Sequence, residues 1–181
     1  MDPDSLVKLL IALFLVLLNG FFVAAEFSIV KVRYSQIQIK AAEGNTMAKQ
    51  AESIIKNLDA YLSATQLGIT LASLALGWVG ESALHHIIEG IFRSLDIELA
   101  QTTVTTISVV CSFLLITVMH IVFGELVPKS IAIRKSEATT LFIAYPLHLF
   151  YNIFRPFIWL MNSLSNGFLK IIKIHPVSEH V

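Results

Sequence analysis

Three long apolar stretches constrain this chain more than any other feature of its sequence. They lie at about 6–30, 61–80 and 102–127, and each reaches the roughly 20 apolar residues that a helix needs to cross a bilayer. Only 14% of the 181 residues are charged, whereas a soluble domain of this size carries about 25%. The sequence therefore predicts an all-α integral membrane protein with three transmembrane helices.

Charge and motif content exclude several classes of function. The net charge is zero, so the chain has no basic field for nucleic acid. No phosphate-binding loop, GxSxG, HExxH or paired metal-binding cysteines occur, since Cys111 is the only cysteine. We therefore expect a protein that is neither an enzyme nor a nucleic-acid binder.

The distribution of Lys and Arg predicts the orientation of the three spans. Five of these residues lie between the first and second spans, and only Arg93 lies between the second and third. Lys129, Arg134 and Lys135 follow the third span. Because basic loops stay in the cytoplasm, we expect the N-terminus and the 81–101 loop outside, and the C-terminus inside, a plasma membrane.

Two segments are expected to lie outside the spans, on the cytoplasmic side. The polar stretch 31–60 reads as a helix with Gly44-Asn45 near its middle. The apolar segment 136–174 is broken by Pro146, His148, Arg155 and Pro156. Interfacial or hairpin helices wrapped around the cytoplasmic end are favoured there over extra spans, because 157–169 is too short to return across the bilayer.

A carboxylate next to a proline marks the end of the third span. Pro128 has no N–H to bond the carbonyl of Gly124, so we expect a helix break and a free carbonyl oxygen beside Glu125. Oxygen pairs of this kind suit a hard cation. The alternative is an interfacial ion pair between Glu125 and Lys129, four residues apart.

The second span carries a polar stripe. At about 100° per residue, its members fall within about 80° of arc; they are Ser63, Gln66, Thr70, Ser73 and Gly77. The stripe is interpreted either as helix packing through small residues or as the wall of an ion path.

Asn19 and Glu26 place two further polar groups on one face of the first span, seven residues apart. Glu26 is open to two interpretations. It can form an ion pair with Lys31 at the interface, or it can act as a second carboxylate near the pathway.

The candidate ligands of the cation are all oxygen atoms, supplied by Glu125, the Gly124 carbonyl, Ser73, Thr70 and Gln66. Such a set argues against soft metals. One carboxylate with neutral oxygens and water is the usual arrangement for Mg²⁺. Na⁺ tolerates the same ligands, so the residues alone do not separate the two ions.

Three motifs in order resemble the transmembrane domain of the CNNM/CorC family, in particular its bacterial hemolysin-like branch. They are NGFFVAAEF at 19–27, TQLGITLASLALGW at 65–78 and FGELVPK at 123–129. The resemblance extends over nearly the whole chain, from about 6 to 174. Residues 1–174 are therefore expected to form one transmembrane domain, with interfacial helices at about 136–174.

The resemblance implies a homodimer of three-span subunits with a cytoplasmic belt of helices. It also implies Mg²⁺ export driven by Na⁺ entry, from an inward-facing cavity. Family members continue into a pair of CBS modules, so 175–181 is expected to be a linker toward modules outside this chain.

In that family the ion is held by the glutamate of the GE-x-x-P motif, a backbone carbonyl, and polar groups on spans one and two. These correspond here to Glu125, Gly124 and the span-two stripe, with Ser73 at the position of the family's asparagine. The chain departs from the family at 23–25, where Val-Ala-Ala replaces a serine-rich sequence.

The sequence leaves two functions in competition. The first is a dimeric Mg²⁺ exporter centred on Glu125. The second is a non-transporting membrane anchor or sensor that regulates another transporter, in which the stripe is packing and Glu125 pairs with Lys129. A pore-forming toxin has no support beyond the hemolysin label.

Overall fold

The described part of the chain is helical throughout. A computed structural model describes residues 3–95 and 100–172, and no strand occurs in these two ranges. Three of its helical segments are long and apolar enough to cross a membrane: Pro3–Lys31, Leu58–Phe92 and Thr102–Arg134. The prediction of three transmembrane helices is confirmed at this level.

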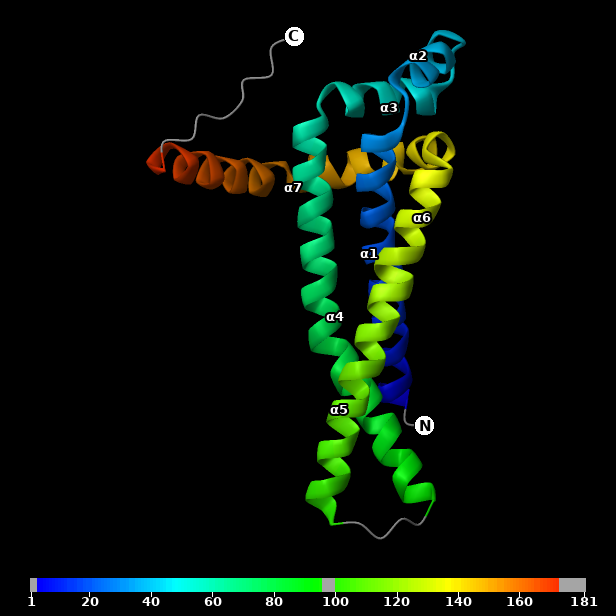
Figure 1. Ribbon diagram of the computed structural model, residues 1–181, viewed down its shortest axis with the longest axis vertical. Helices are drawn as coiled ribbons and strands as arrows, with labels where there is room; N and C mark the ends of the chain where they lie inside the picture. The colour runs from blue at the N-terminus through cyan, green and yellow to red at the C-terminus, as the bar shows by residue number, and fades with distance from the viewer. Residues whose placement is uncertain (1–2, 96–99, 173–181) are drawn as a thin grey trace.

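The three long segments run side by side as a bundle (Figure 1). The first is α1, Pro3–Lys31, and the second is α4, Leu58–Ser94. The third is a composite of α5, Gln101–Met119, the π-helical η1, His120–Leu126, and α6, Val127–Arg134. The expected helix break at Pro128 is wrong, because the third segment stays helical from α5 through η1 and α6.

The expected loop at 81–101 is largely helix. α4 has 37 residues and ends only at Ser94, so at about 1.5 Å per residue it is roughly 55 Å long. This length exceeds a hydrocarbon core of about 30 Å. Together with α5 it forms the narrow lower end of the molecule in Figure 1.

The polar segment after α1 forms two helices rather than one interrupted helix. They are α2, Tyr34–Ala42, and α3, Thr46–Lys56. Gly44 lies between them with φ 94°, a conformation that glycine adopts without strain. The Asn45 side chain then caps α3 by accepting a hydrogen bond from the Ala48 N–H at 3.1 Å.

The last helix, α7, is a single element of 36 residues, Ser136–Ile171, with two prolines inside it. The expected hairpin at these prolines is therefore wrong. The carbonyls that lose their helical partner belong to Phe142 and Asn152, four residues before each proline, and both residues are exposed. Other partners can therefore reach them, and the helix continues.

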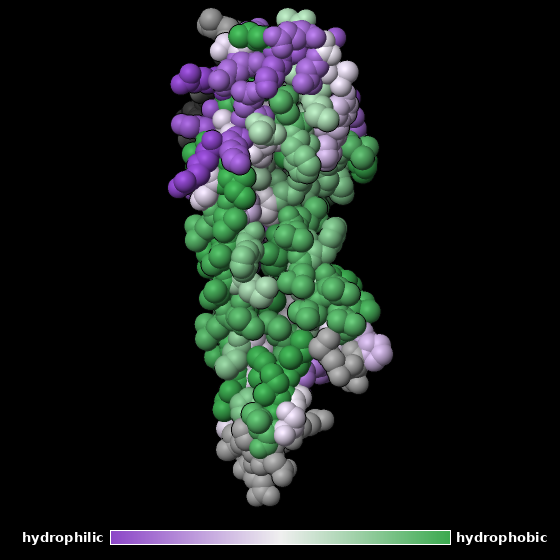
Figure 2. Space-filling view, turned by 90° about the vertical axis from the view of Figure 1, so that its right-hand side faces the viewer, coloured by the Kyte–Doolittle hydropathy of each residue, from purple (hydrophilic) through white to green (hydrophobic). Residues whose placement is uncertain are grey.

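α7 crosses the bundle near the end that carries α2 and α3 (Figure 1). Figure 2 shows hydrophilic residues gathered at this end and an almost continuous hydrophobic surface along the bundle below it. α7 therefore crosses close to the boundary between the polar and the apolar surface. Its place relative to a bilayer stays a prediction, and the linker expected at 175–181 lies outside the described residues.

The main hydrophobic core lies where the bundle meets the polar end. Side chains from α1, α2, α3, α4 and α7 meet there, among them Phe22, Ile29, Ile37, Ile54, Tyr61, Ile143 and Leu147. All of these are almost completely buried. This core packs α7 and the α2–α3 pair against the C-terminal end of α1 and the N-terminal end of α4.

A close approach of α1 to α4 gives a first testable prediction. A Cβ at Gly68 would lie 2.5 Å from atoms of the Phe22 ring, whereas a Cβ at Gly77 would meet nothing within 4 Å. We expect Gly68→Ala to lower the free energy of unfolding in detergent by about 1–3 kcal/mol through overpacking. The matched control Gly77→Ala should be neutral or stabilising, and equal effects of the two variants would contradict the packing.

The α2–α3 pair gives a second prediction. The Glu52 carboxylate accepts hydrogen bonds from Lys56 Nζ at 2.9 Å and Tyr34 Oη at 3.1 Å, and these hold the pKa of Glu52 below its ordinary value. The stabilisation is therefore present above the unfolded pKa and is lost as the pH falls through the folded pKa. Tyr34→Phe should raise the pKa of Glu52 in an NMR titration. An unchanged pKa would show that the tyrosine does not bond the carboxylate.

Candidate functional site

The candidate site forms where α1 touches η1, and a glycine makes this contact possible. A Cβ at Gly20 would lie 2.9 Å from Pro128 Cγ and 3.1 Å from the Phe123 carbonyl oxygen. Any larger residue would push α1 away from the third span. The close approach places the preceding residue of α1, Asn19, directly against the backbone of η1.

Asn19 is completely buried and bonds that backbone. Its Nδ2 donates to the carbonyl oxygen of Gly124 at 3.0 Å. The sequence predicted this carbonyl to be free, and that expectation is wrong because the Asn19 amide replaces the N–H that Pro128 lacks. A carbonyl oxygen has two lone pairs, so one remains for a further donor or a cation.

The π-helical turn brings together two residues that α-helical geometry would separate. Positions five residues apart on an α-helix differ by about 140°, so α-helical geometry would put His120 and Glu125 on different faces. A π-helix bonds residue i to residue i+5. In η1, His120 Nε2 lies 3.9 Å from Glu125 Oε1, so the histidine is a functional candidate that the sequence analysis missed.

Ser73 is the point at which α4 joins this arrangement. Its Oγ donates to Asn19 Oδ1 at 3.2 Å and lies 3.4 Å from His120 Nε2. Asn19, Ser73, His120, Gly124 and Glu125 therefore form one connected group, which we call the η1 cluster. It combines three spans and contains one carboxylate, one imidazole and several neutral oxygens.

A cavity of about 230 Å³ opens beside the η1 cluster, between α4 and the third span. Ser73 and His120 line it together with Leu76, Gly77, Phe113, Ile116 and Thr117. Glu125 is not among the lining residues, and its side chain is half exposed. Ser73 and His120 of the η1 cluster thus face the cavity, while the carboxylate of Glu125 is accessible at the surface of the subunit.

The other members of the span-two stripe lie apart from the η1 cluster. Gln66 and Thr70 are exposed on α4. Ser63 instead contacts α7, because its Oγ donates to Asn162 Oδ1 at 2.9 Å. The structure therefore brings Ser73 to the cluster and leaves Gln66 and Thr70 on the surface of the single subunit.

The expected ion pairs of Glu26 and Glu125 with lysines do not form within the described residues. Lys129 Nζ lies 4.5 Å from the centre of the Phe27 ring, and no ion pair joins it to Glu125 there. Glu26 is partly buried and likewise has no ion pair with Lys31 in the described ranges. Neither carboxylate therefore forms the ion pair that was expected from the sequence, Glu26 with Lys31 or Glu125 with Lys129.

The sequence as a whole matches a known family of membrane domains. Residues 10–181 match the cyclin M transmembrane N-terminal domain, CNNM. The chain belongs to the CNNM family. The expected resemblance is thereby confirmed, and with three candidate spans the chain is a multi-pass membrane protein.

The CNNM chain is similar to several bacterial proteins. The UPF0053 protein YhdT of Bacillus subtilis is 44% identical over 179 residues, covering 99% of this chain and 38% of the relative. The UPF0053 protein YrkA of the same organism is 41% identical over 174 residues, covering 96% and 40%. A polyamine export protein of Haemophilus influenzae is 27% identical over 166 residues, covering 91% and 38%. The chain spans 38% to 41% of the length of its most similar Bacillus relatives.

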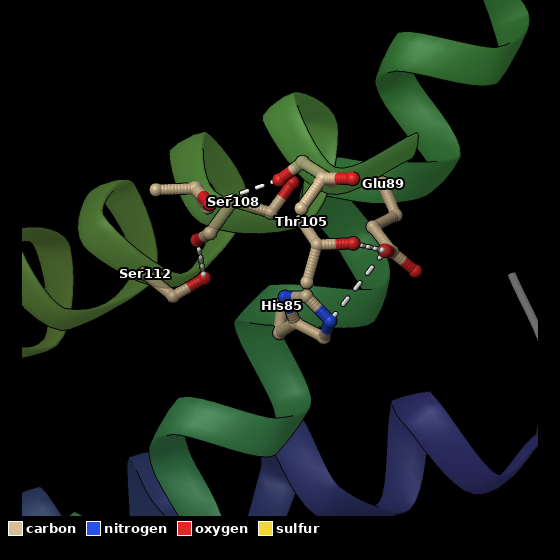
Figure 3. A network of polar contacts seen from close by, with 7 residues as sticks. His85, Glu89, Thr105, Ser108 and Ser112 are labelled. Atoms are coloured by element: carbon tan, nitrogen blue, oxygen red, sulfur yellow. Dashed lines mark hydrogen bonds and ion pairs between the residues drawn. The ribbon is translucent and has the colours of Figure 1, made fainter. Parts of the chain in front are cut away.

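A second polar group of this CNNM chain joins α4 to α5 at the far end of the bundle (Figure 3). Glu89 Oε1 lies 3.6 Å from His85 Nε2 and accepts a hydrogen bond from Thr105 Oγ1 at 3.3 Å. Ser108 is completely buried one turn further along α5. Glu89 thus has partners on two helices, which holds the two outer helix ends together.

Metal ligands are few around both polar groups. No cluster of three or more His, Cys, Asp or Glu side chains occurs among the residues that the structure describes. A cation at the η1 cluster would therefore depend on one carboxylate, with neutral oxygens or water completing its shell.

The bond between Asn19 and Gly124 gives a third prediction. We expect Asn19→Ala to lower the free energy of unfolding by about 1–3 kcal/mol, because the buried carbonyl of Gly124 loses its donor. The control Ser73→Ala removes the hydrogen bond to Asn19 Oδ1 and the contact with His120 but leaves the Gly124 carbonyl its donor, and should cost about 0.5–1.5 kcal/mol. Equilibrium unfolding in detergent measures both, and a smaller effect of Asn19→Ala than of Ser73→Ala would contradict this bond.

Proposed function

We propose that this CNNM domain exports Mg²⁺ in exchange for Na⁺ entry, through an inward-facing cavity at the η1 cluster. One observation carries the proposal. Glu125 is a half-exposed carboxylate in a segment long and apolar enough to cross the membrane, and it lies beside the imidazole of His120, which lines the cavity, rather than beside a lysine. Ionisable groups in such segments are functional candidates by default.

The chemistry of the η1 cluster favours a hard, partly hydrated cation. Glu125 supplies the negative charge, and Gly124 supplies the second lone pair of its carbonyl. Ser73 supplies a hydroxyl oxygen, while Thr70 and Gln66 contribute through water or after a movement of α4. Mg²⁺ keeps several waters and is typically held by one or two carboxylates, so this sparse set suits it.

A sparse set of ligands also suits transport. An ion that must leave the site on each cycle needs binding strong enough to enter and weak enough to depart. One carboxylate with neutral oxygens satisfies this better than a cage of several acids. His120 adds a second role, because its ring lines the cavity beside the carboxylate and can guide the ion between them.

The orientation of the domain in this proposal follows from the basic residues. Lys31 ends α1 and four more Lys or Arg residues lie between α1 and α4, so the end with α2 and α3 is assigned to the cytoplasm. The η1 cluster lies in the half of the bundle nearer this end (Figure 1). Gln66, Thr70 and Glu125 are exposed on the subunit, which supports a homodimer in which a second copy closes the cavity.

The proposal predicts a specific loss of Mg²⁺ binding. We expect Glu125→Gln to weaken Mg²⁺ binding by more than about tenfold, because even the loss of an outer partner of a ligand costs about 10–100-fold. Isothermal titration of the purified protein measures the affinity. The matched control Glu89→Gln removes a carboxylate at the other end of α4 and should leave the affinity unchanged.

Flux in sealed vesicles decides between transport and regulation. Mg²⁺ efflux that depends on an opposing Na⁺ gradient and is lost in Glu125→Gln supports the exporter. Intact binding without flux supports a membrane anchor or sensor of another transporter. Because one relative is named a polyamine export protein, the same vesicles are loaded with spermidine, and spermidine flux without Mg²⁺ flux would overturn Mg²⁺ as the cargo.

A further inference from the structure

A second cavity lies far from the η1 cluster, between α7 and the first turn of α4. Its volume is about 290 Å³, close to the lower limit for small-molecule sites. It is lined by Ala60, Tyr151, Arg155, Ile158, Trp159, Asn162, Ser163 and Asn166. We propose that this α4–α7 pocket binds the phosphate headgroup of an anionic membrane phospholipid, a role separate from cation transport.

The polar lining of the pocket consists mainly of hydrogen-bond donors. Arg155 supplies a guanidinium whose fork of N–H groups matches phosphate oxygens. Asn162, Ser163 and Asn166 add amide and hydroxyl donors along the same side of α7. None of the described lining residues is acidic, and no ion pair occupies Arg155 within the described ranges. This composition selects an oxyanion over a cation.

One acidic residue lies near the pocket without lining it. Asp59 precedes Ala60 in α4, and its backbone carbonyl accepts a hydrogen bond from Ser63 Oγ at 3.1 Å. The same oxygen lies 2.9 Å from Asn162 Oδ1, so Ser63 shares its one hydrogen between the Asp59 carbonyl and this amide oxygen, and the N–H₂ group of Asn162 is left to donate. The pocket is therefore preorganised from the α4 side.

The surroundings of the pocket match a lipid better than a soluble phosphate compound. α7 crosses the bundle beside its polar end (Figure 1), next to the hydrophobic surface of the spans. Trp159 is 69% exposed, and apolar side chains continue along the helix at Phe157, Leu160, Leu164 and Phe168. Tryptophan is typical of membrane interfaces, and basic pockets beside spans bind anionic headgroups. At about 100° per residue these four apolar side chains lie on the face of α7 opposite Arg155, so a headgroup in the pocket would lie beside Trp159 and its acyl chains would pass around α7 to reach them.

Quenching of tryptophan fluorescence by brominated lipids tests the proposal. The chain has two tryptophans, so in a Trp78→Phe background only Trp159 reports. The protein is reconstituted in phosphatidylcholine vesicles that contain brominated phosphatidylglycerol or brominated phosphatidylcholine. We expect the relative binding constant at Trp159 to favour phosphatidylglycerol about fivefold, the effect of one basic residue near an anionic surface.

Charge variants separate a pocket from diffuse attraction. Arg155→Gln should bring the relative binding constant close to one. Lys170→Gln removes an equal charge from the same helix but outside the pocket, and should leave the preference unchanged. Asn166→Leu should reduce the preference while keeping the charge. Equal losses in Arg155→Gln and Lys170→Gln, or no preference in the parent protein, would overturn the site.

Soluble glycerol phosphate distinguishes the two sources of the phosphate group. Added at millimolar concentration, it should leave Trp159 quenching by brominated phosphatidylglycerol unchanged. Relief of the quenching would show that the pocket takes free phosphate esters, which would overturn the assignment to a lipid. Exporter activity is not needed for any of these measurements, so the outcome is independent of the proposed transport.

Discussion

The hydrogen bond from Asn19 to the Gly124 carbonyl is the contact on which the site depends. It supplies the donor that Pro128 cannot, and so lets the third span remain helical through a proline. It also requires α1 to approach η1 closely, which the missing side chain of Gly20 permits. The oxygen of the same amide accepts a hydrogen bond from Ser73, and this bond joins α4 to the other two spans. One buried amide thus holds three membrane segments at a common level.

Much of the fold could be predicted from the sequence, because membrane segments have to satisfy their backbone internally. Apolar length alone identified three spans, whereas the segment around Gly44-Asn45 was predicted as one helix and forms two, α2 and α3. Proline misled the prediction in two places. At Pro128 the lost bond is replaced by a side chain from another helix, and in α7 the freed carbonyls of Phe142 and Asn152 lie on exposed positions. Neither compensation is visible in local sequence.

The site was predicted only in part, for a geometric reason. Glu125 and Gly124 stand out in sequence as a carboxylate and a glycine before a proline. His120 does not, because only the π-helical winding moves it toward Glu125. Asn19 was noted as a polar residue of the first span, but its partner lies 105 residues away. Short polar motifs name candidates, whereas the contacts between distant segments decide which of them meet.

The direction in which the Glu125 side chain points depends on the π-helical winding of η1. A turn of this kind holds more residues than an α-helical turn. If η1 were to rewind by one residue, everything beyond it would rotate by about 100° relative to α5. Such a rotation would carry Glu125 away from His120 without bending the span. The segment therefore has a geometry in which twist, rather than tilt, turns the carboxylate toward the imidazole or away from it.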